Sequence, residues 1–427
     1  MKTSSTKAPS ASSNSKPMQV PDENKPADAG PSAVTVDRRA GPRRGLRAAF
    51  IALIVGSLAG CAVVTGDDPG AGPPEAPFAD GMDDATLPAP IVRGKSLWTP
   101  TRWSELPGWG SDSLHEAWNA WLKTCEKTGA PATPGSPELC RQVRQLSIAT
   151  PEQQRDWVQR RFVPYRITEP DGRAAVGLLT GYYEPVLEAR RLPDSVFRVP
   201  LHAEPQGLPR GQPWYTRQQI DTQPVAQRAL EGRVIAWLAD PIDAMILQIQ
   251  GSGRLTITEP DGRQRQVRLA FAAHNGHTYR SPVRWLLDQG AIREGHWAAV
   301  RAWARRHPQR VNDMMWSNPR TVFFREEALD DFDAKFGPRG AQGVPLTPGR
   351  SIAVDPHSIP YGTPVWLVTQ GPTLTQQKLV LAQDTGGAIL GAVRADLFTG
   401  WGGFGDPAYT IAAGLNQPLQ LWALWPK

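Results

Sequence analysis

The sequence predicts a mainly β fold with helices at its periphery, and three observations lead to this fold class. Glycine and proline are abundant, with 40 and 42 among the 427 residues, which favours many turns over long helices. The apolar runs are short and separated by turn signals such as Asp261-Gly262, a pattern typical of strands. Helical patterns are confined to two intervals. We therefore expect an all-β core and a second β module between about residues 185 and 272.

The two helical intervals lie at residues 111–165 and 281–308. In the first, Ser136 precedes Pro137 and Thr150 precedes Pro151. A hydroxyl residue followed by proline is a typical helix start, because proline fits the first helical position. The second interval contains the segments SPVRWLLDQG and HWAAVRAWARRHP. We expect both intervals to form helices outside the β core.

The expected strands surround the second helical interval. Before it they are residues 174–190, 233–240, 244–257 and 265–273; after it they are residues 350–356, 363–370, 378–384, 410–415 and 419–425. Each is a short apolar or alternating run bounded by turn residues. We find no internal repeat of fixed period.

The charge is distributed in a way that argues against nucleic-acid binding. Residues 1–60 contain nine lysines and arginines but only four acidic residues, which leaves 38 basic and 37 acidic residues in the remainder. A nearly neutral folded part lacks the net positive field that phosphate binding needs. The basic excess therefore indicates targeting.

The targeting segment consists of a basic stretch, residues 38–47, and an apolar run, residues 48–59. The run fits a signal peptide and is shorter than the roughly 20 residues that span a bilayer. It ends in Leu58-Ala59-Gly60-Cys61, which resembles a bacterial lipobox and implies lipidation of Cys61. By the same resemblance, Ala62 implies an outer-membrane lipoprotein that faces the periplasm. A short signal anchor with an incidental cysteine is the alternative.

Two cysteines remain after Cys61, namely Cys125 and Cys140. An even pair in an oxidising compartment favours a disulfide, and two free buried thiols are the alternative. No CxxC, HExxH or His/Cys cluster has metal-binding spacing. We therefore expect neither a metal nor another cofactor.

Three aspartates in the C-terminal part are candidates for chemistry. Asp355 and Asp384 end apolar strand-like runs, and Asp396 lies in a third apolar stretch. A partly desolvated carboxyl has a raised pKa and can act as a general acid near neutral pH. The pair Gly386-Gly387 allows close backbone approach or a positive φ beside Asp384. The alternative for each aspartate alone is a structural cap at a turn or strand end.

These aspartates and four further segments resemble the membrane-bound lytic transglycosylase A family. The segments are Leu179-Thr180-Gly181-Tyr182-Tyr183-Glu184-Pro185, residues 249–253 (IQGSG), residues 275–281 (NGHTYRS) and residues 318–324 (NPRTVFF). The resemblance covers residues 98–427. It implies a double-psi β-barrel catalytic domain built from both ends of the chain, with a smaller β domain inserted and a glycan-binding groove between the two.

The implied organisation has five parts. They are an extension and signal peptide at 1–60, a flexible tether at 61–97, barrel segments with helices at 98–184, the inserted β domain at 185–272, and the rest of the barrel with the three-aspartate region at 273–427. The resemblance implies that Asp396 is the catalytic acid, Asp384 the supporting carboxylate and Asp355 the third member. Candidate substrate-binding residues are Thr180, Gly181, Tyr182, Tyr183, Gln250, Gly251, Ser252, Gly386 and Gly387.

The implied reaction cuts the β-1,4 bond between N-acetylmuramic acid and N-acetylglucosamine and closes a 1,6-anhydro ring. The implied partners are peptidoglycan glycan strands, the outer membrane through the lipid anchor, and cell-wall synthesis or division proteins. Residue spacing leaves other functions open. Asp384 and Asp396 fit an inverting hydrolase pair equally well. A lipoprotein that binds peptidoglycan without cutting it and a three-carboxylate metal site are further alternatives.

Overall fold

The computed structural model describes residues 86–127, 129 and 133–427. The expected signal segment, Cys61 and most of the tether lie outside these residues. The prediction of a mainly β chain is confirmed. The strands are β1 (Ile91–Val92), β2 (Leu97–Pro100), β3 (Phe162–Thr168), β4 (Gly177–Arg190), β5 (Val199–His202), β6 (Val234–Leu238), β7 (Ser252–Thr258), β8 (Gln264–His274), β9 (Val322–Ala328), β10 (Ser351–Val354), β11 (Pro364–Gln370), β12 (Thr375–Asp384), β13 (Arg394–Gly402) and β14 (Asn416–Pro426).

Helices occupy the expected intervals and several further positions. They are α1 (Leu114–Thr124), α2 (Pro137–Gln145), α3 (Pro151–Arg161), α4 (Arg217–Thr222), α5 (Pro224–Ala229), α6 (Pro241–Gln250), α7 (Pro282–Asp288), α8 (Trp297–Arg306), α9 (Val311–Trp316) and α10 (Pro407–Gly414). Ser136 and Thr150 cap α2 and α3 as expected. The side chain of each accepts a hydrogen bond from the backbone N–H three residues later in the chain. The N-terminal ends of these two helices are therefore predicted correctly by the capping residues in the sequence.

Six strands pair in a first ring, in the order β4, β13, β10, β12, β11 and β14, and β14 pairs back with β4. The β4–β13 and β10–β12 pairs are parallel, and the other pairs are antiparallel. Its apolar core includes Leu179 of β4, Val380 of β12 and Leu397 of β13. β3, β2 and β1 extend the sheet outward from β14.

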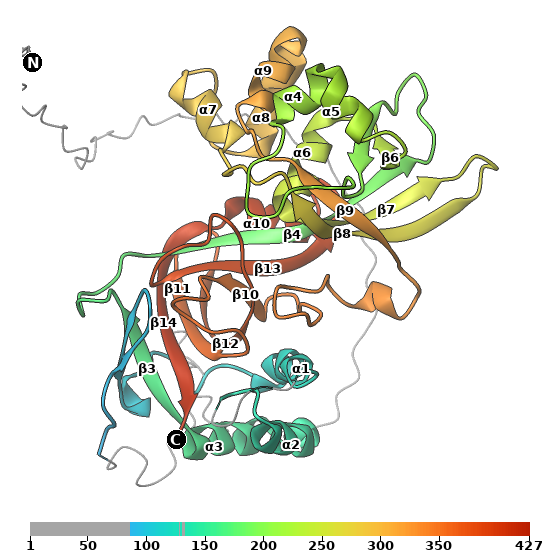
Figure 1. Ribbon diagram of the computed structural model, residues 1–427. Coiled ribbons are helices and arrows are strands. Elements are labelled where there is room, and N and C mark those ends of the chain that lie inside the picture. The colour runs from blue at the N-terminus through green and yellow to red at the C-terminus, as the bar shows by residue number, and fades with distance from the viewer. Residues whose placement is uncertain (1–85, 128, 130–132) are drawn as a thin grey trace, which may run out of the picture. The chain divides into compact units, whose positions relative to one another are not determined.

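A second ring of pairings uses the other half of β4. There β4 pairs with β7 and, through Arg190, with β6; β7 pairs with β8, and β8 with β9. A bridge between Ala203, just after β5, and Phe324 of β9 completes the circuit, because β5 pairs with β6. The long strand β4, whose label marks it in Figure 1, thus belongs to both rings.

A buried ion-pair cluster lies where β4 passes between the rings. The side chain of Glu184 is fully buried and bonds Arg254 Nε and Arg268 Nε, each at 2.7 Å. Both guanidinium groups also donate to the carbonyl of Phe336, and Arg254 lies 3.9 Å above the ring of Trp401 on β13. Because buried charges need partners, this cluster ties β4, β7, β8 and β13 together.

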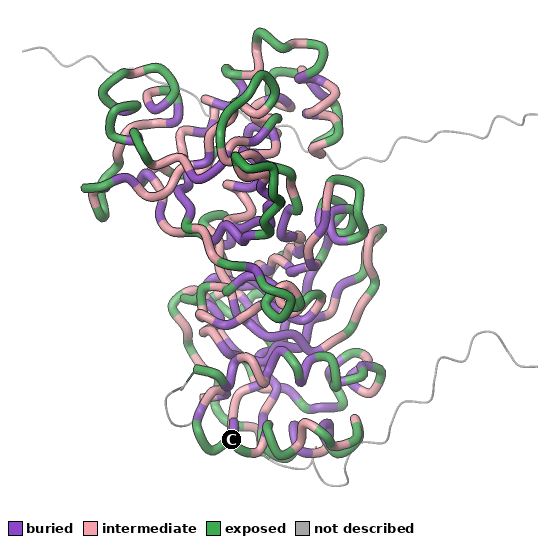
Figure 2. Tube along the Cα trace, turned by 90° about the vertical axis from the view of Figure 1, so that its right-hand side faces the viewer, coloured by how far each residue is buried: buried purple, intermediate pink, exposed green. Residues whose placement is uncertain are grey.

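The helices α1–α3 pack on the first ring through a tryptophan-rich core. Trp118, Trp121 and Trp157 contact one another with ring centroids between 5.4 and 5.6 Å apart. Cys125 and Cys140 form a disulfide that joins the end of α1 to α2. Buried residues concentrate along the strands and the inner sides of the helices (Figure 2). The expected helices at residues 111–165 therefore form one layer, except that residues 162–165 begin β3.

The first half of one expected strand and nearly all of another are helical in the structure, whereas the second half of the first, residues 252–257, is strand β7 as expected. Residues 244–250 belong to α6, which begins at Pro241 after the Asp240 cap and ends at Gln250, followed by the C-cap Gly251 with φ of 82°. Residues 410–414 belong to α10, which also begins at a proline after an aspartate, Pro407 after Asp406. In both, a short run rich in apolar residues fits a buried strand and a buried helix equally well, and the start signal decides for the helix.

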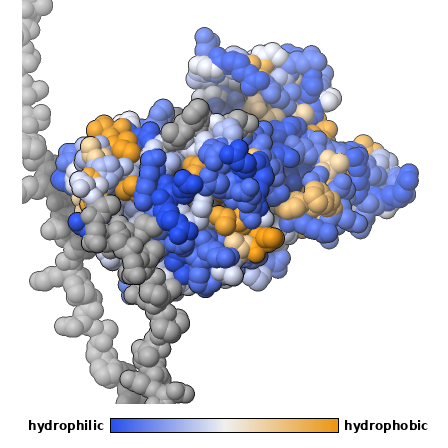
Figure 3. Space-filling view, turned by 90° about the horizontal axis from the view of Figure 1, so that it is seen from below, coloured by the Kyte–Doolittle hydropathy of each residue, from blue (hydrophilic) through white to orange (hydrophobic). Residues whose placement is uncertain are grey.

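The surface gives no sign of a membrane span within the part of the chain that the structure describes, since none of its helices is both long and apolar enough to cross a bilayer. On the face shown in Figure 3, hydrophobic patches are separated by hydrophilic surface.

Candidate active site

The strand register brings two of the three aspartates to one place. Ala353 of β10 pairs with Asp384 of β12 on one side and with Asp396 of β13 on the other. Asp396 also pairs with Thr180 of β4. Residues directly opposite in neighbouring strands point to the same side of a sheet. Since Leu179 and Leu397 point into the core, Thr180 and Asp396 point away from it.

Asp396 is partly exposed, and among the described residues only the neutral hydroxyl of Thr180 donates to its carboxyl. Thr180 Oγ1 donates to Asp396 Oδ1 at 2.8 Å. The second oxygen, Oδ2, accepts no hydrogen bond from any residue that the structure describes. Burial raises the pKa of Asp396 to about 6, and the nearby charge of Asp384 adds to this, against the opposing effects of Thr180 and Arg394. Asp396 can therefore hold a proton in mildly acidic solution.

Asp384 is surrounded by donors instead. Oδ1 accepts from the backbone N–H groups of Ala341 and Thr385, both at 2.9 Å, and Oδ2 accepts from the Tyr182 hydroxyl at 2.9 Å. Burial raises the pKa of Asp384, although these three hydrogen bonds oppose the rise. Burial also raises the pKa of the Tyr182 hydroxyl well above its ordinary value, so Tyr182 remains a donor. Both oxygens of Asp384 are thus occupied by protein groups.

Asp355 is separate from this pair in its contacts. Its carboxylate is 1% exposed and accepts hydrogen bonds from Lys95 Nζ at 2.8 Å, Gly391 N at 3.0 Å and His357 N at 3.0 Å. Burial acts to raise the pKa of Asp355, but these bonds together hold the pKa below its ordinary value. Through these bonds Asp355 links the N-terminal segment, at Lys95, to the loop before β13, at Gly391.

Comparisons with known proteins identify the family to which the chain belongs. Residues 178–325 match the MltA specific insert domain, and residues 350–425 match the 3D domain. The membrane-bound lytic murein transglycosylase A of Vibrio cholerae is 30% identical over 279 residues, which cover 58% of this chain and 69% of that protein. The chain belongs to the membrane-bound lytic murein transglycosylase A family.

Solved structures of this family have the same fold. The lytic transglycosylase LtgG of Burkholderia pseudomallei is 38% identical and has a TM-score of 0.53, covering 77% of this chain and 95% of that chain. MltA from Neisseria gonorrhoeae is 26% identical with a TM-score of 0.64, covering 80% of this chain and 96% of that chain. The family resemblance of the sequence is thereby confirmed.

Side chains along β4 point alternately to opposite sides of the sheet, so the candidate residues of this transglycosylase A member on β4 fall into two sets. Thr180 and Tyr182 point toward Asp396 and Asp384. Gly181 faces α10, where an added Cβ would come within 2.7 Å of the Ala412 Cα. Tyr183 is 6% exposed, and its ring contacts Tyr409 of α10 at 5.5 Å. The expectation that the Tyr183 ring lines a sugar-binding surface is therefore corrected, because that ring is packed in the core.

The candidates from residues 249–253 contact the backbone of β4 through Gln250. Gln250 is the last residue of α6, and its Oε1 accepts a hydrogen bond from Tyr183 N at 3.0 Å. Gly251 has the positive φ that ends the helix, and the buried Ser252 begins β7. These residues fix how α6 approaches β4. Their contact with substrate stays a prediction.

Gly386 and Gly387 follow Asp384 in the turn after β12. Neither has a positive φ, so that explanation for the pair is wrong. Gly387 is exposed, with open space where a Cβ would stand. Close approach of a bulky ligand remains the interpretation that the geometry allows.

Sequence reasoning missed Arg394, which the structure places at the site. Its Nη2 donates to Thr180 Oγ1 at 2.8 Å, and its Nη1 donates to the carbonyl of Ala395 at 2.6 Å. Arg394 stands two positions before Asp396 on the same strand, and residues at this spacing lie on one side of a sheet. That spacing was the available signal.

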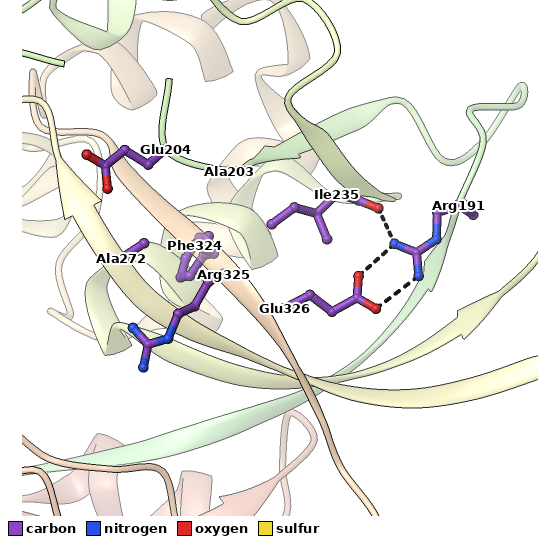
Figure 4. A pocket seen from close by; sticks show the side chains of 8 residues that line it. All are labelled: Arg191, Ala203, Glu204, Ile235, Ala272, Phe324, Arg325 and Glu326. Atoms are coloured by element: carbon purple, nitrogen blue, oxygen red, sulfur yellow. Dashed lines mark hydrogen bonds and ion pairs between the residues drawn. The ribbon is translucent and has the colours of Figure 1, made fainter. Parts of the chain in front are cut away.

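A hollow of about 550 Å³ lies elsewhere, in the second ring. Its lining is Arg191, Ala203, Glu204, Ile235, Ala272, Phe324, Arg325 and Glu326 (Figure 4). Arg191 there bonds both Glu259 and Glu326. None of the three aspartates lines it. Among the described residues, no group of three or more His, Cys, Asp and Glu side chains could hold a metal ion.

Proposed function

We propose that this protein is a lytic transglycosylase that cuts the β-1,4 bond between N-acetylmuramic acid and N-acetylglucosamine in peptidoglycan. The observation that carries the proposal is the contrast between the two paired carboxyls. Asp396 has a pKa raised to about 6 and an oxygen that accepts no hydrogen bond from the described part of the chain, whereas Asp384 is held by three donors. The Vibrio cholerae relative, named a lytic murein transglycosylase, supports the same activity.

In the proposed reaction, protonated Asp396 gives its proton to the glycosidic oxygen. The bond from that oxygen to C1 of N-acetylmuramic acid then breaks, and the electron pair stays with the leaving oxygen. The C6 hydroxyl of the same sugar attacks C1 and closes the 1,6-anhydro ring. Its proton returns to the Asp396 carboxylate, so one residue acts as acid and then as base. The attack is intramolecular and gains effective concentration.

The surroundings of Asp384 favour this reaction over inverting hydrolysis. An inverting hydrolase needs a second carboxylate that accepts a proton from water. Three donated hydrogen bonds hold the Asp384 carboxyl in place and use most of its capacity to accept. We assign Asp384 the role of a fixed neighbour that raises the pKa of Asp396.

We also propose that the first ring is the double-psi β-barrel that the family resemblance implies. The two parallel pairs within a six-strand circuit support this. The inserted module was expected at residues 185–272. The pairing of β9 with β8 favours an insert that extends to about residue 328, with the glycan held between the insert and the barrel.

For location, we propose that Cys61 carries a lipid and anchors the protein to the outer membrane, facing the periplasm. Cell-wall synthesis or division proteins are the further partners proposed. Labelling of cells with a fatty-acid probe tests the anchor: wild-type protein should take up label and sediment with outer membranes. Equal labelling of Cys61→Ala would exclude lipidation at Cys61.

The function is tested by digesting purified peptidoglycan with the form that begins after Cys61 and weighing the released muropeptides. We expect products one water lighter than hydrolysis products, without a reducible end. Asp396→Asn should keep the fold and sediment with peptidoglycan but release nothing. Reducing ends would mean a hydrolase, and sedimentation without release by the wild type would mean a binding protein. Muropeptide release near the wild-type level by Asp396→Asn would exclude Asp396 as the acid.

A further inference from the structure

A chain of two hydrogen bonds leads from Arg394 to the proposed acid. Arg394 Nη2 lies 2.8 Å from Thr180 Oγ1, and Thr180 Oγ1 lies 2.8 Å from Asp396 Oδ1. The guanidinium is held in turn by the carbonyls of Ala395, at 2.6 Å, and Leu178, at 3.4 Å. Arg394 and Asp396 are on β13, and Thr180 is the partner of Asp396 on β4. The fold therefore fixes all three groups relative to one another.

The donor and acceptor roles along this chain have one satisfactory arrangement. A guanidinium only donates, so the Thr180 oxygen is the acceptor in the first contact. A threonine hydroxyl has a single hydrogen, and directing it at Asp396 Oδ1 satisfies every group in the chain. If the carboxyl proton stood on Oδ1, that hydrogen would lose its acceptor. The arrangement therefore leaves Oδ2 to carry the proton.

We propose that Arg394 is a positioning residue that acts through Thr180. It sets the direction of the Thr180 hydroxyl, which places the transferable proton of Asp396 on Oδ2, the oxygen that no described residue contacts by a hydrogen bond. This inference rests on the proposed function and reassigns Thr180 from substrate binding to support of the acid. Neither Arg394 nor Thr180 touches the reacting atoms in this account.

This chain of two hydrogen bonds, called the relay below, stabilises the transition state more than the resting enzyme. As the proton leaves, Asp396 gains negative charge, and a hydrogen bond to a charged acceptor is stronger than one to a neutral carboxyl. The Thr180 bond therefore strengthens during the reaction, which lowers the barrier. The same bond favours the ionised form of Asp396 at rest. Losing the relay should thus lower kcat and also move the alkaline limb of the pH profile upward.

The experiment is a double-mutant cycle in the soluble form that begins after Cys61, with kcat and its pH profile measured on purified peptidoglycan. Thr180→Val removes the hydroxyl but keeps the shape, and we expect about a tenfold loss of kcat, as for one hydrogen bond to a charged group. Arg394→Gln should give a loss of similar size. The double variant should resemble Thr180→Val alone, because the arginine acts through the threonine.

Two conservative variants and one control accompany the cycle. Thr180→Ser keeps the hydroxyl and should stay near wild type. Arg394→Lys keeps a donor and a charge, and should recover part of the activity lost in Arg394→Gln. Arg305→Gln removes an exposed guanidinium on α8 and should change nothing. Circular dichroism and sedimentation with peptidoglycan establish that each variant is folded and binds. If Arg394→Gln does not fold, the Arg394→Lys profile with the two Thr180 variants decides.

Either of two results would overturn the inference while leaving the proposed function intact. One is a double variant whose loss is the product of the two single losses, about a hundredfold. The other is a fall in kcat with an alkaline limb that stays in place, which is the behaviour of a merely structural residue. Absence of anhydro products from the wild type would instead refute the proposed function itself.

Discussion

Replacing Asp384 by asparagine should move the pH dependence of cleavage to lower pH. Asp384 and Asp396 pair with Ala353 on either side of β10, so their backbones lie two strand spacings, or roughly 10 Å, apart. A unit charge at that distance contributes about 0.8–1.7 kcal/mol for an effective dielectric constant between about 40 and 20. Division by about 1.4 kcal/mol per pKa unit gives a shift of roughly 0.6–1.2 units in the pKa of Asp396.

The sign follows from the charge. Burial is the first cause of the raised pKa of Asp396, and the negative charge of Asp384 adds to it because that charge disfavours ionisation of Asp396. Asparagine removes that charge, so the pKa of Asp396 falls and the protonated acid is lost at a lower pH. The amide oxygen of asparagine can still accept from Ala341 N and Thr385 N, which preserves the local backbone.

The assay is the pH profile of kcat for anhydro-muropeptide release, measured for wild type, Asp384→Asn and the surface control Asp261→Asn. The alkaline limb should shift downward for Asp384→Asn only. This direction is opposite to the upward shift expected for Thr180→Val. An unmoved limb, or an upward shift, would contradict the assignment of Asp384 as the charged neighbour of the acid.

Two further predictions concern stability, each measured by urea unfolding. Glu184→Gln should lower the free energy of unfolding by about 3 kcal/mol, because it leaves the buried Arg254 and Arg268 without a counter-charge; a loss below about 1 kcal/mol, or one matched by the exposed control Glu231→Gln, would contradict this. Asp355→Asn should cost most at neutral pH. The pKa of Asp355 is lowered by its partners, so its stabilisation is present above its ordinary pKa near 4 and is lost as the pH falls through the lower folded value. A gap from wild type that is as large in acid as at pH 7 would count against ion pairing with Lys95.

The strands could be predicted where turn residues bound a short apolar or alternating run, as for β4, β8 and β11. The failures at α6 and α10 come from short runs, AMILQIQ and TIAAG, whose few polar residues do not distinguish a helical period from a strand period. Their start signals, Asp240-Pro241 and Asp406-Pro407, were present in the sequence. The short strand β5 and the pairing of β9 with β8 depend on long-range contacts that no local pattern encodes.

At the site, the sequence located the aspartates but not the roles of their neighbours. Alternation along β4 could have separated Thr180 and Tyr182 from Gly181 and Tyr183, since neighbouring strand residues face opposite sides. Which side holds the acid depends on the register of β4 with β13. That register is set by parallel pairing across more than two hundred residues of chain, so only the structure supplies it.

The shared strand β4 has a consequence for any attempt to isolate the three-aspartate part of the chain. A fragment limited to residues 350–425, the match to the 3D domain, contains β10–β13 and most of β14 but lacks β4, which pairs with both β13 and β14. Two strand edges would then be open, and open edges recruit other chains. Such a fragment should aggregate rather than fold as a minimal enzyme, so this acid site is inseparable from the segment that carries the insert.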